Sequence, residues 1–186
     1  MPNRREFSGA VTAAASLAAT SLAAHPTLAA ASDRVRLGFI GTANRGSQLI
    51  DAFLPHKDCE IVAVCDVDSV TLGKTVEKLD GKPKPYADFR EVIDRDDLDA
   101  IVIATPDHWH AIQTIMACDA GKDVYVEKPL SITVTEGRAM VNAARRNERI
   151  VQVGTHRRSS KLYRELAPQI DRGMIGKVCV SRAFRT

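Results

Sequence analysis

The stretch from residue 35 to residue 54 most constrains what this chain can fold into. A short apolar run leads through a glycine-punctuated turn into a helical pattern, whose apolar residues share one face: Leu49, Ile50, Phe53 and Leu54. A strand, a tight turn and a helix in this order bring free backbone N–H groups and the positive end of a helix dipole to one point. That point is suited to binding a diphosphate.

The turn matches the dinucleotide-binding fingerprint G-x-G-x-x-G with one departure. Gly41 allows the tight turn and Gly46 allows the helix to pack close to the strand, whereas Ala43 replaces the glycine over which the phosphates normally lie. Glycine-rich strand ends are common, so the fingerprint depends on its downstream context. With that context, we predict that the cofactor is bound by six consecutive residues: Gly41, Thr42, Ala43, Asn44, Arg45 and Gly46.

The context is an acidic residue after a second apolar run, residues 61–65. Asp66 follows Gly46 by twenty residues, where dinucleotide-binding folds place a carboxylate that accepts hydrogen bonds from the adenosine ribose. The alternative is that Asp66 caps a helix starting near Ser69. In the ribose-binding role, the carboxylate would repel a 2′-phosphate, so we expect NAD rather than NADP as the cofactor.

Strand and helix patterns alternate from residue 35 to residue 153. Further strands are expected over 86–89, 100–104, 123–126 and 150–153, with helices over 70–79, near 92–93, and over 111–120 and 134–147. This order predicts an α/β fold, a doubly wound parallel sheet of the Rossmann type, over residues 32–157. Ligands of such sheets lie over the carboxyl ends of the strands, where five scattered residues should converge: Gly41, Asp66, Thr105, Glu127 and Gly154.

The first thirty-one residues are expected to be an export signal. Arg4 and Arg5 precede Phe7 and a weakly apolar run, and Ala29, Ala30 and Ala31 offer small residues for cleavage. The run is too short and too rich in small polar residues to predict a membrane span. An alanine-rich tail is the alternative, but it explains neither the arginine pair nor the cleavage-like end. We therefore expect export of a folded, cofactor-loaded protein by the twin-arginine route to the periplasm.

Charge and cysteine usage exclude other classes of function. The net charge of +3 is slight and spread along the chain, which argues against a nucleic-acid partner. The four cysteines show no C-x-x-C spacing, and His108 and His110 should point in different directions at a helix start. We therefore predict no metal site.

Lys128 is the strongest candidate for chemistry, because it follows a predicted buried strand and lies between Glu127 and Pro129. Its ammonium could hydrogen-bond a substrate hydroxyl or carbonyl and assist proton transfer, although a surface lysine is the alternative. We expect further cofactor contacts from Thr105, Pro106, His110 and Glu127, and substrate contacts from His108, Trp109 and His156. For the residues near the helix start, local packing is the competing explanation.

Taken in order, residues 41–46, Asp66, residues 104–110, the triplet 127–129 and residues 151–155 resemble the Gfo/Idh/MocA oxidoreductase family. The resemblance implies a Rossmann domain that binds NAD(P), with Lys128 as the E-K-P lysine that contacts substrate near the nicotinamide. It also implies a second α/β domain, built on a mostly antiparallel sheet, that supplies other acid/base residues and much of the sugar pocket. Residues 158–186 would be only its connecting helix and, at 175–180, its first strand.

The resemblance implies hydride transfer between NAD(P) and a hydroxyl-bearing carbon of a sugar or cyclitol, by a full-length protein that is a homo-oligomer. Two alternatives remain open. Some relatives use transient oxidation to cleave a glycosidic bond, as NAD-dependent glycosidases. A non-catalytic dinucleotide-binding fragment is the other.

Overall fold

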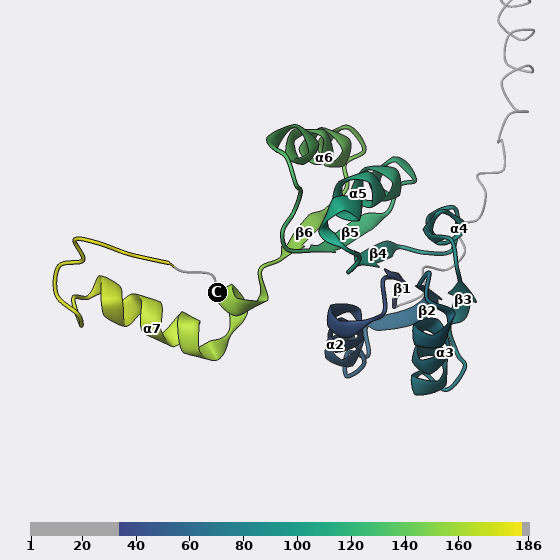
Figure 1. Cartoon of the computed structure of the whole chain (residues 1–186), viewed down its shortest axis with the longest axis horizontal. Helices are drawn as coiled ribbons and strands as arrows, with labels where there is room; N and C mark the ends of the chain where they lie inside the picture. Colours follow the sequence, from purple (N-terminus) through teal and green to yellow (C-terminus); the bar gives the residue numbers. More distant parts are fainter. Residues whose placement is uncertain (1–33, 184–186) are drawn as a thin grey trace, which may run out of the picture. The chain divides into compact units, whose positions relative to one another are not determined.

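The computed structural model describes residues 34–183, in which a six-stranded parallel sheet has the order β3-β2-β1-β4-β5-β6 (Figure 1). Its strands are β1 (Val35–Ile40), β2 (Cys59–Cys65), β3 (Lys84–Tyr86), β4 (Ala100–Ile103), β5 (Asp123–Glu127) and β6 (Val151–Gly154). This order confirms the predicted doubly wound α/β fold. The expected export signal at residues 1–31 lies outside the described residues.

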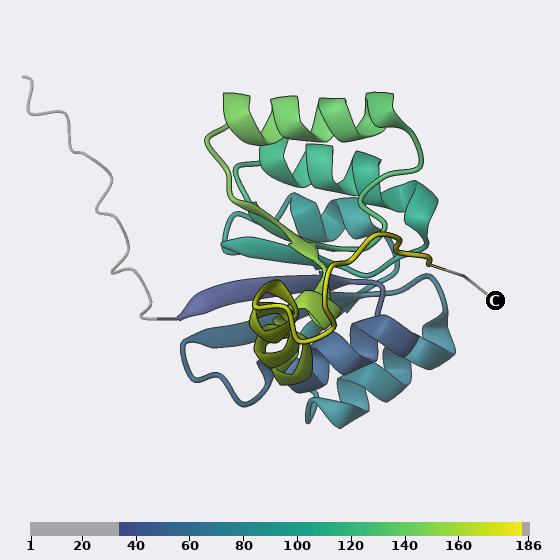
Figure 2. The same cartoon turned by 90° about the vertical axis from the view of Figure 1, so that its left-hand side faces the viewer.

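Helices cover both faces of the sheet (Figure 2). Two lie on one face, α2 (Asn44–Phe53) and α3 (Ser69–Lys78), and three on the other, α4 (Phe89–Ile93), α5 (His110–Asp119) and α6 (Val134–Arg146). Two 3₁₀ turns, η1 (Asp107–Trp109) and η2 (His156–Ser159), and helix α7 (Lys161–Asp171) complete the described elements. No helix within residues 34–183 is long and apolar enough to cross a membrane.

The alternation of side chains along the strands divides the apolar core into two layers. Phe39 of β1 packs with Ile50 of α2 on one face, while the next residue, Ile40, packs toward α4 and α5 on the other. Because both faces are covered, the central strands are mostly apolar, as the sequence pattern indicated.

The order of the strands reverses at β1, which pairs with β2 on one side and with β4 on the other. The connections therefore leave β1 and β4 in opposite directions, and a crevice forms beyond the ends of these two strands. Helix α2 approaches this crevice closely, because a Cβ atom on Gly46 would overlap the carbonyl oxygen of Gly41. The predicted role of Gly46 in helix–strand packing agrees with this geometry.

Two expected strands differ from the structure. The third covers Lys84–Tyr86 rather than residues 86–89, and its Pro85 is tolerated because β3 is an edge strand that needs hydrogen bonds on one side only. Residues 175–180, predicted as a strand, are irregular and exposed. A strand requires a neighbour to complete its hydrogen bonds, and no described strand pairs with this segment.

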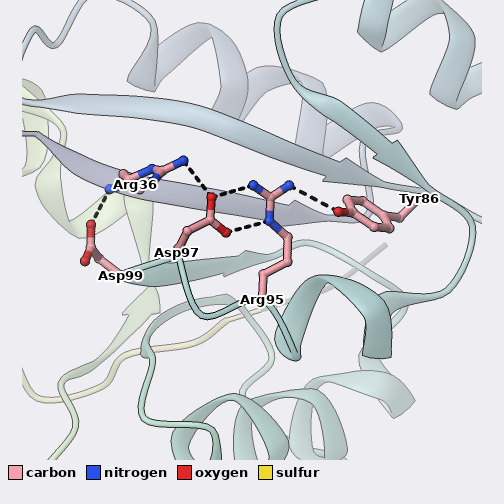
Figure 3. Close-up of polar contacts among 5 residues, drawn as sticks. All are labelled: Arg36, Tyr86, Arg95, Asp97 and Asp99. Carbon is pink, nitrogen blue, oxygen red and sulfur yellow. Dashed lines mark hydrogen bonds and ion pairs between the residues drawn. The ribbon is translucent and has the colours of Figure 1, made fainter. Parts of the chain in front are cut away.

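A polar cluster joins β1, β3 and the connection from α4 to β4 (Figure 3). Asp97 accepts hydrogen bonds from Arg95 Nε at 2.8 Å and from Arg36 Nη2 at 2.6 Å, and Arg95 also donates to the hydroxyl of Tyr86. Hydrogen bonding from Arg95 lowers the pKa of the Asp97 carboxyl to about 2. The cluster thus fixes the segment that leads into β4.

Candidate functional site

A cavity of about 560 Å³ lies beyond the carboxyl ends of β1, β2 and β4, where the fold predicts a ligand. Its walls include six residues that the sequence analysis selected: Gly41, Ala43, Asp66, Thr105, Pro106 and Trp109. The structure therefore brings together segments that are far apart in the chain. The cavity volume is in the range of small-molecule and cofactor sites.

The N-terminus of α2 opens at this cavity without a side-chain cap. The side chains of Asp68, Asp88 and Thr133 cap α3, α4 and α6, respectively. The capping position of α2 is Ala43, whose side chain has no group that could accept a hydrogen bond from the first backbone N–H groups. These groups and the helix dipole are available to an anion, as the fingerprint predicts.

The departure from the glycine fingerprint causes no backbone strain. Ala43 has φ −74° and ψ 163°, a conformation open to any residue, whereas Gly41 has φ +84°, which favours glycine. A Cβ atom at Gly41 would also come within 2.8 Å of the Ala104 backbone. Of these two positions, only Gly41 strictly requires glycine.

Asp66 is held at the edge of the cavity by the fingerprint turn. Its Oδ2 accepts hydrogen bonds from the backbone N–H of Thr42 at 2.8 Å and from the Thr42 hydroxyl at 3.2 Å. Its Oδ1 accepts one from the backbone N–H of Asp68 at 3.1 Å, which leaves acceptor capacity for a ligand hydroxyl. Since Asp68 caps α3 by accepting from Val70, the capping role considered for Asp66 belongs to Asp68.

Thr42 was predicted to contact the cofactor, but its side chain is buried and turned toward Asp66. Its hydroxyl orients the carboxylate rather than facing the cavity. Asn44 is exposed at the first residue of α2 and has φ +37°, a left-handed conformation that asparagine tolerates well.

One wall of the cavity is aromatic. The rings of Phe89 and Trp109 meet edge to face with centroids 5.7 Å apart, and the Arg90 guanidinium lies 5.8 Å from the Phe89 ring. Burial raises the pKa of the Cys65 thiol, which also lines the cavity, to about 12, so this group is neutral at physiological pH. An apolar wall with a carboxylate at its edge suits a heterocyclic base joined to a ribose.

Nine lining residues were not selected as site residues from the sequence: Ile40, Cys65, Val67, Ala87, Asp88, Phe89, Arg90, Ala104 and Gln113. Phe89 was assigned to a strand, whereas it begins α4. The available signal was Asp88, a capping residue placed directly before an apolar helical segment.

Two residues that were predicted to contact the cofactor form a hydrogen bond with each other. Arg45 Nε donates to Glu127 Oε1 at 2.7 Å, and Glu127 is only 3% exposed. Its Oε2 accepts from the backbone N–H of Lys128 at 3.2 Å. Burial and then the Glu127 carboxylate raise the pKa of the neighbouring Tyr125. This pair joins the fingerprint turn to the segment that carries Lys128.

Lys128 is exposed just after β5, and its ammonium makes no ion pair with any residue of the described range 34–183. It does not line the cavity. His108 and His156 are likewise exposed and outside the cavity walls, and the buried His110 contacts only backbone oxygens through its ring nitrogens. These residues follow the carboxyl ends of β4, β5 and β6, as expected. The cavity itself is lined by residues suited to the adenosine half of a dinucleotide.

The cavity therefore fits a dinucleotide at three points. The uncapped end of α2 suits the diphosphate, Asp66 suits a ribose hydroxyl, and the aromatic wall suits the base. Trp109 lines the same cavity as Asp66, so its position favours the adenosine half of the ligand rather than the substrate contact that the sequence suggested.

Several known proteins resemble this chain in sequence and in fold. The family described as "Oxidoreductase family, NAD-binding Rossmann fold" (Gfo/Idh/MocA) matches residues 35–155. The "Glycosyl hydrolase family 109 protein 1" of Shewanella sp. strain ANA-3 is 35% identical over 123 residues, and the "Alpha-N-acetylgalactosaminidase" of Shewanella oneidensis is 34% identical over 123 residues. Each alignment covers 62% of this chain but only 27% of the relative.

Among solved structures, myo-inositol 2-dehydrogenase from Lactobacillus plantarum superposes with a TM-score of 0.72 and 31% sequence identity. The superposition covers 78% of this chain and 43% of the dehydrogenase. The family match extends over well over half of the chain and contains every element that builds the cavity. The chain belongs to the Gfo/Idh/MocA family of NAD-binding oxidoreductases.

Proposed function

We propose that this chain is the cofactor-binding part of an oxidoreductase that uses NAD, in preference to NADP, to act on a hydroxyl of a sugar or cyclitol. The observation that carries the proposal is the pairing of two features across one cavity, the uncapped N-terminus of α2 and the Asp66 carboxylate. A 2′-phosphate would bring negative charge toward that carboxylate, which supports the choice of NAD. The inositol dehydrogenase neighbour supports the substrate class.

When bound, NAD supplies a hydride acceptor for the carbon that bears the substrate hydroxyl. The residues of this chain would bind and orient the cofactor: α2 would hold the diphosphate, Asp66 would hold the ribose, and Phe89 and Trp109 would form the wall beside the base. Lys128 would contact the substrate oxygen and, in its neutral amine form, would accept the hydroxyl proton as the hydride leaves the carbon; its side chain is exposed and forms no ion pair in the described part of the chain.

Trp109 allows a direct test of binding, because it is the sole tryptophan of the sequence and lines the cavity. Added NADH should quench Trp109 fluorescence and accept its excitation energy, with NADPH binding more weakly. Asp66→Ala should weaken NADH binding about tenfold or more through the loss of charge-assisted hydrogen bonds. The matched control is Asp68→Ala, which removes the α3 cap and should cost about 1 kcal/mol of stability with little change in affinity. Equal NADH affinity in wild type and Asp66→Ala would refute the proposal.

The role of Lys128 requires a separate experiment. Lys128→Met should leave NADH affinity within about twofold, since the side chain lies outside the cavity walls. In a protein that also contains the sugar-binding domain, the same variant should lose most of its turnover. Unchanged turnover would remove Lys128 from the mechanism.

The similarity to two glycoside hydrolases favours a second candidate function, glycosidic cleavage through transient oxidation of the sugar. The cofactor site would be the same, but the net reaction would leave no reduced NAD. Following NADH absorbance and sugar release together would separate the two reactions. A protein that binds NADH and supports neither reaction would be a dinucleotide-binding module.

We also infer that the protein is exported to the periplasm in folded form, with its cofactor bound. The supporting features are the Arg4–Arg5 pair and the small residues at 29–31. Replacing both arginines by lysine should retain the protein in the cytoplasm. A periplasmic protein that still begins at residue 1, or unchanged export of the lysine variant, would contradict this inference.

A further inference from the structure

The ring of His110 links two segments that border the site. Its Nδ1 lies 2.7 Å from the carbonyl oxygen of Pro129, and its Nε2 lies 2.9 Å from the carbonyl oxygen of Thr105. Both distances are those of hydrogen bonds, and the residue is only 1% exposed. The ring thus joins the end of β4 to the segment after β5, next to Lys128.

The two contacts place a demand on the protons of the ring. A carbonyl oxygen can only accept a hydrogen bond, while a neutral imidazole has one N–H donor and one bare nitrogen. With a single proton, one contact would bring a nitrogen lone pair against a carbonyl oxygen in a site closed to water. Both contacts are hydrogen bonds only when both nitrogens carry a proton.

We propose that His110 is an imidazolium in the folded protein at neutral pH, and that it is a positioning residue that fixes the Lys128–Pro129 segment against Thr105. Its use in catalysis rests on the role proposed for Lys128. The protonation state of His110 does not depend on the role of Lys128, so each proposal can be disproved without the other.

Burial and the position at the start of α5 both disfavour a positive charge. Two charge-assisted hydrogen bonds oppose these effects, and each is stronger than a bond between neutral groups. The neighbouring buried side chains of α5, Gln113 and Thr114, are uncharged. The elements that contact α5 carry ionisable groups near their facing ends. These groups are Asp88, Arg90, Glu91, Asp107, His108, Glu127, Lys128 and Glu136.

Imidazole nitrogen NMR on the wild-type chain tests the proposal directly. In protein labelled with ¹⁵N-histidine, both His110 nitrogens should have the chemical shifts of protonated nitrogens at pH 7, and both should show slowly exchanging protons. One protonated and one bare nitrogen on His110 in the folded protein would overturn the proposal, whether or not NADH binds.

A pair of variants tests the positioning role. His110→Gln cannot donate in two opposed directions, so the carbonyl ¹³C resonances of Thr105 and Pro129 should both shift, and exchange of the Lys128 amide should quicken about tenfold. The control is His56→Gln, at an exposed histidine in the connection from α2 to β2, which should leave these signals unchanged. Unchanged carbonyl resonances in folded His110→Gln would refute the positioning role, and the wild-type spectrum decides the protonation state if that variant does not fold.

Discussion

Arg45 and Glu127 lie 82 residues apart in the chain and form a hydrogen-bonded ion pair of 2.7 Å between Nε and Oε1. Arg45 belongs to the turn that opens α2, and Glu127 ends β5 one residue before Lys128. The pair therefore connects the proposed diphosphate site to the proposed catalytic lysine.

Arg45→Met should lower the free energy of unfolding by about 2 kcal/mol, because it leaves a buried carboxylate without its partner. This value is below that for a fully buried pair, since the arginine is partly exposed to solvent. Denaturant unfolding measures the loss, and Glu127→Gln in the same chain should restore part of it. Arg138→Met, at an exposed position of α6, is the control. Equal losses in the two arginine variants would show that the ion pair contributes nothing.

Gly46→Ala should destabilise the protein by more than about 2 kcal/mol and weaken NADH binding, because the added methyl would overlap the Gly41 carbonyl oxygen. Gly73→Ala is the matched control, since this glycine lies within α3 and a Cβ atom there meets nothing within 4 Å. The control should gain about 0.5–1 kcal/mol from helix propensity. Thermal unfolding and NADH titration of both variants give the comparison, and a Gly46→Ala protein as stable as wild type would contradict the packing described.

Asp97 should stabilise the protein at neutral pH and lose this effect in acid. Its folded-state pKa of about 2 is below the ordinary value of 3.8, so the contribution is complete above pH ~4 and disappears as the pH falls toward 2. The carboxylate is 38% exposed, so we expect about 1 kcal/mol after solvent screening rather than the full value of the pKa difference. Urea unfolding between pH 2 and pH 7 should show this acid-dependent loss in wild type but not in Asp97→Asn.

Asp80→Asn is the control for Asp97→Asn, because its ion pair with Lys82 is highly exposed on both sides. Its stability should follow that of wild type at every pH. If Asp97→Asn did the same, the cluster in Figure 3 would have no stabilising role.

The features that the sequence predicted correctly have local causes. The apolar runs of the central strands, Gly41 with its φ of +84° and Asp66 at a strand end can all be recognised from their immediate neighbours. The sequence analysis placed the third strand too late because Pro83 and Pro85 together normally indicate a turn. Pro85 is acceptable within β3 only because β3 lies at the edge of the sheet.

Features that depend on contacts across the fold could not be predicted. Phe89 meets Trp109 only because α4 and η1 lie at the same edge of the sheet. The two carbonyl contacts of His110 likewise require β4 and β5 to be neighbours, as their pairing shows. Sequence reasoning selected His110 but assigned it to the cofactor, since the residue type alone does not reveal the partners of its ring.

The bare end of α2 has a consequence for how this protein persists in a cell. No side chain caps its first amides, and a dinucleotide that binds there only in the folded state would link its occupancy to the stability of the folded chain. Raising NADH to a hundred times its dissociation constant would add about 2.7 kcal/mol to the folded state. The melting temperature should therefore rise with the concentration of added NADH.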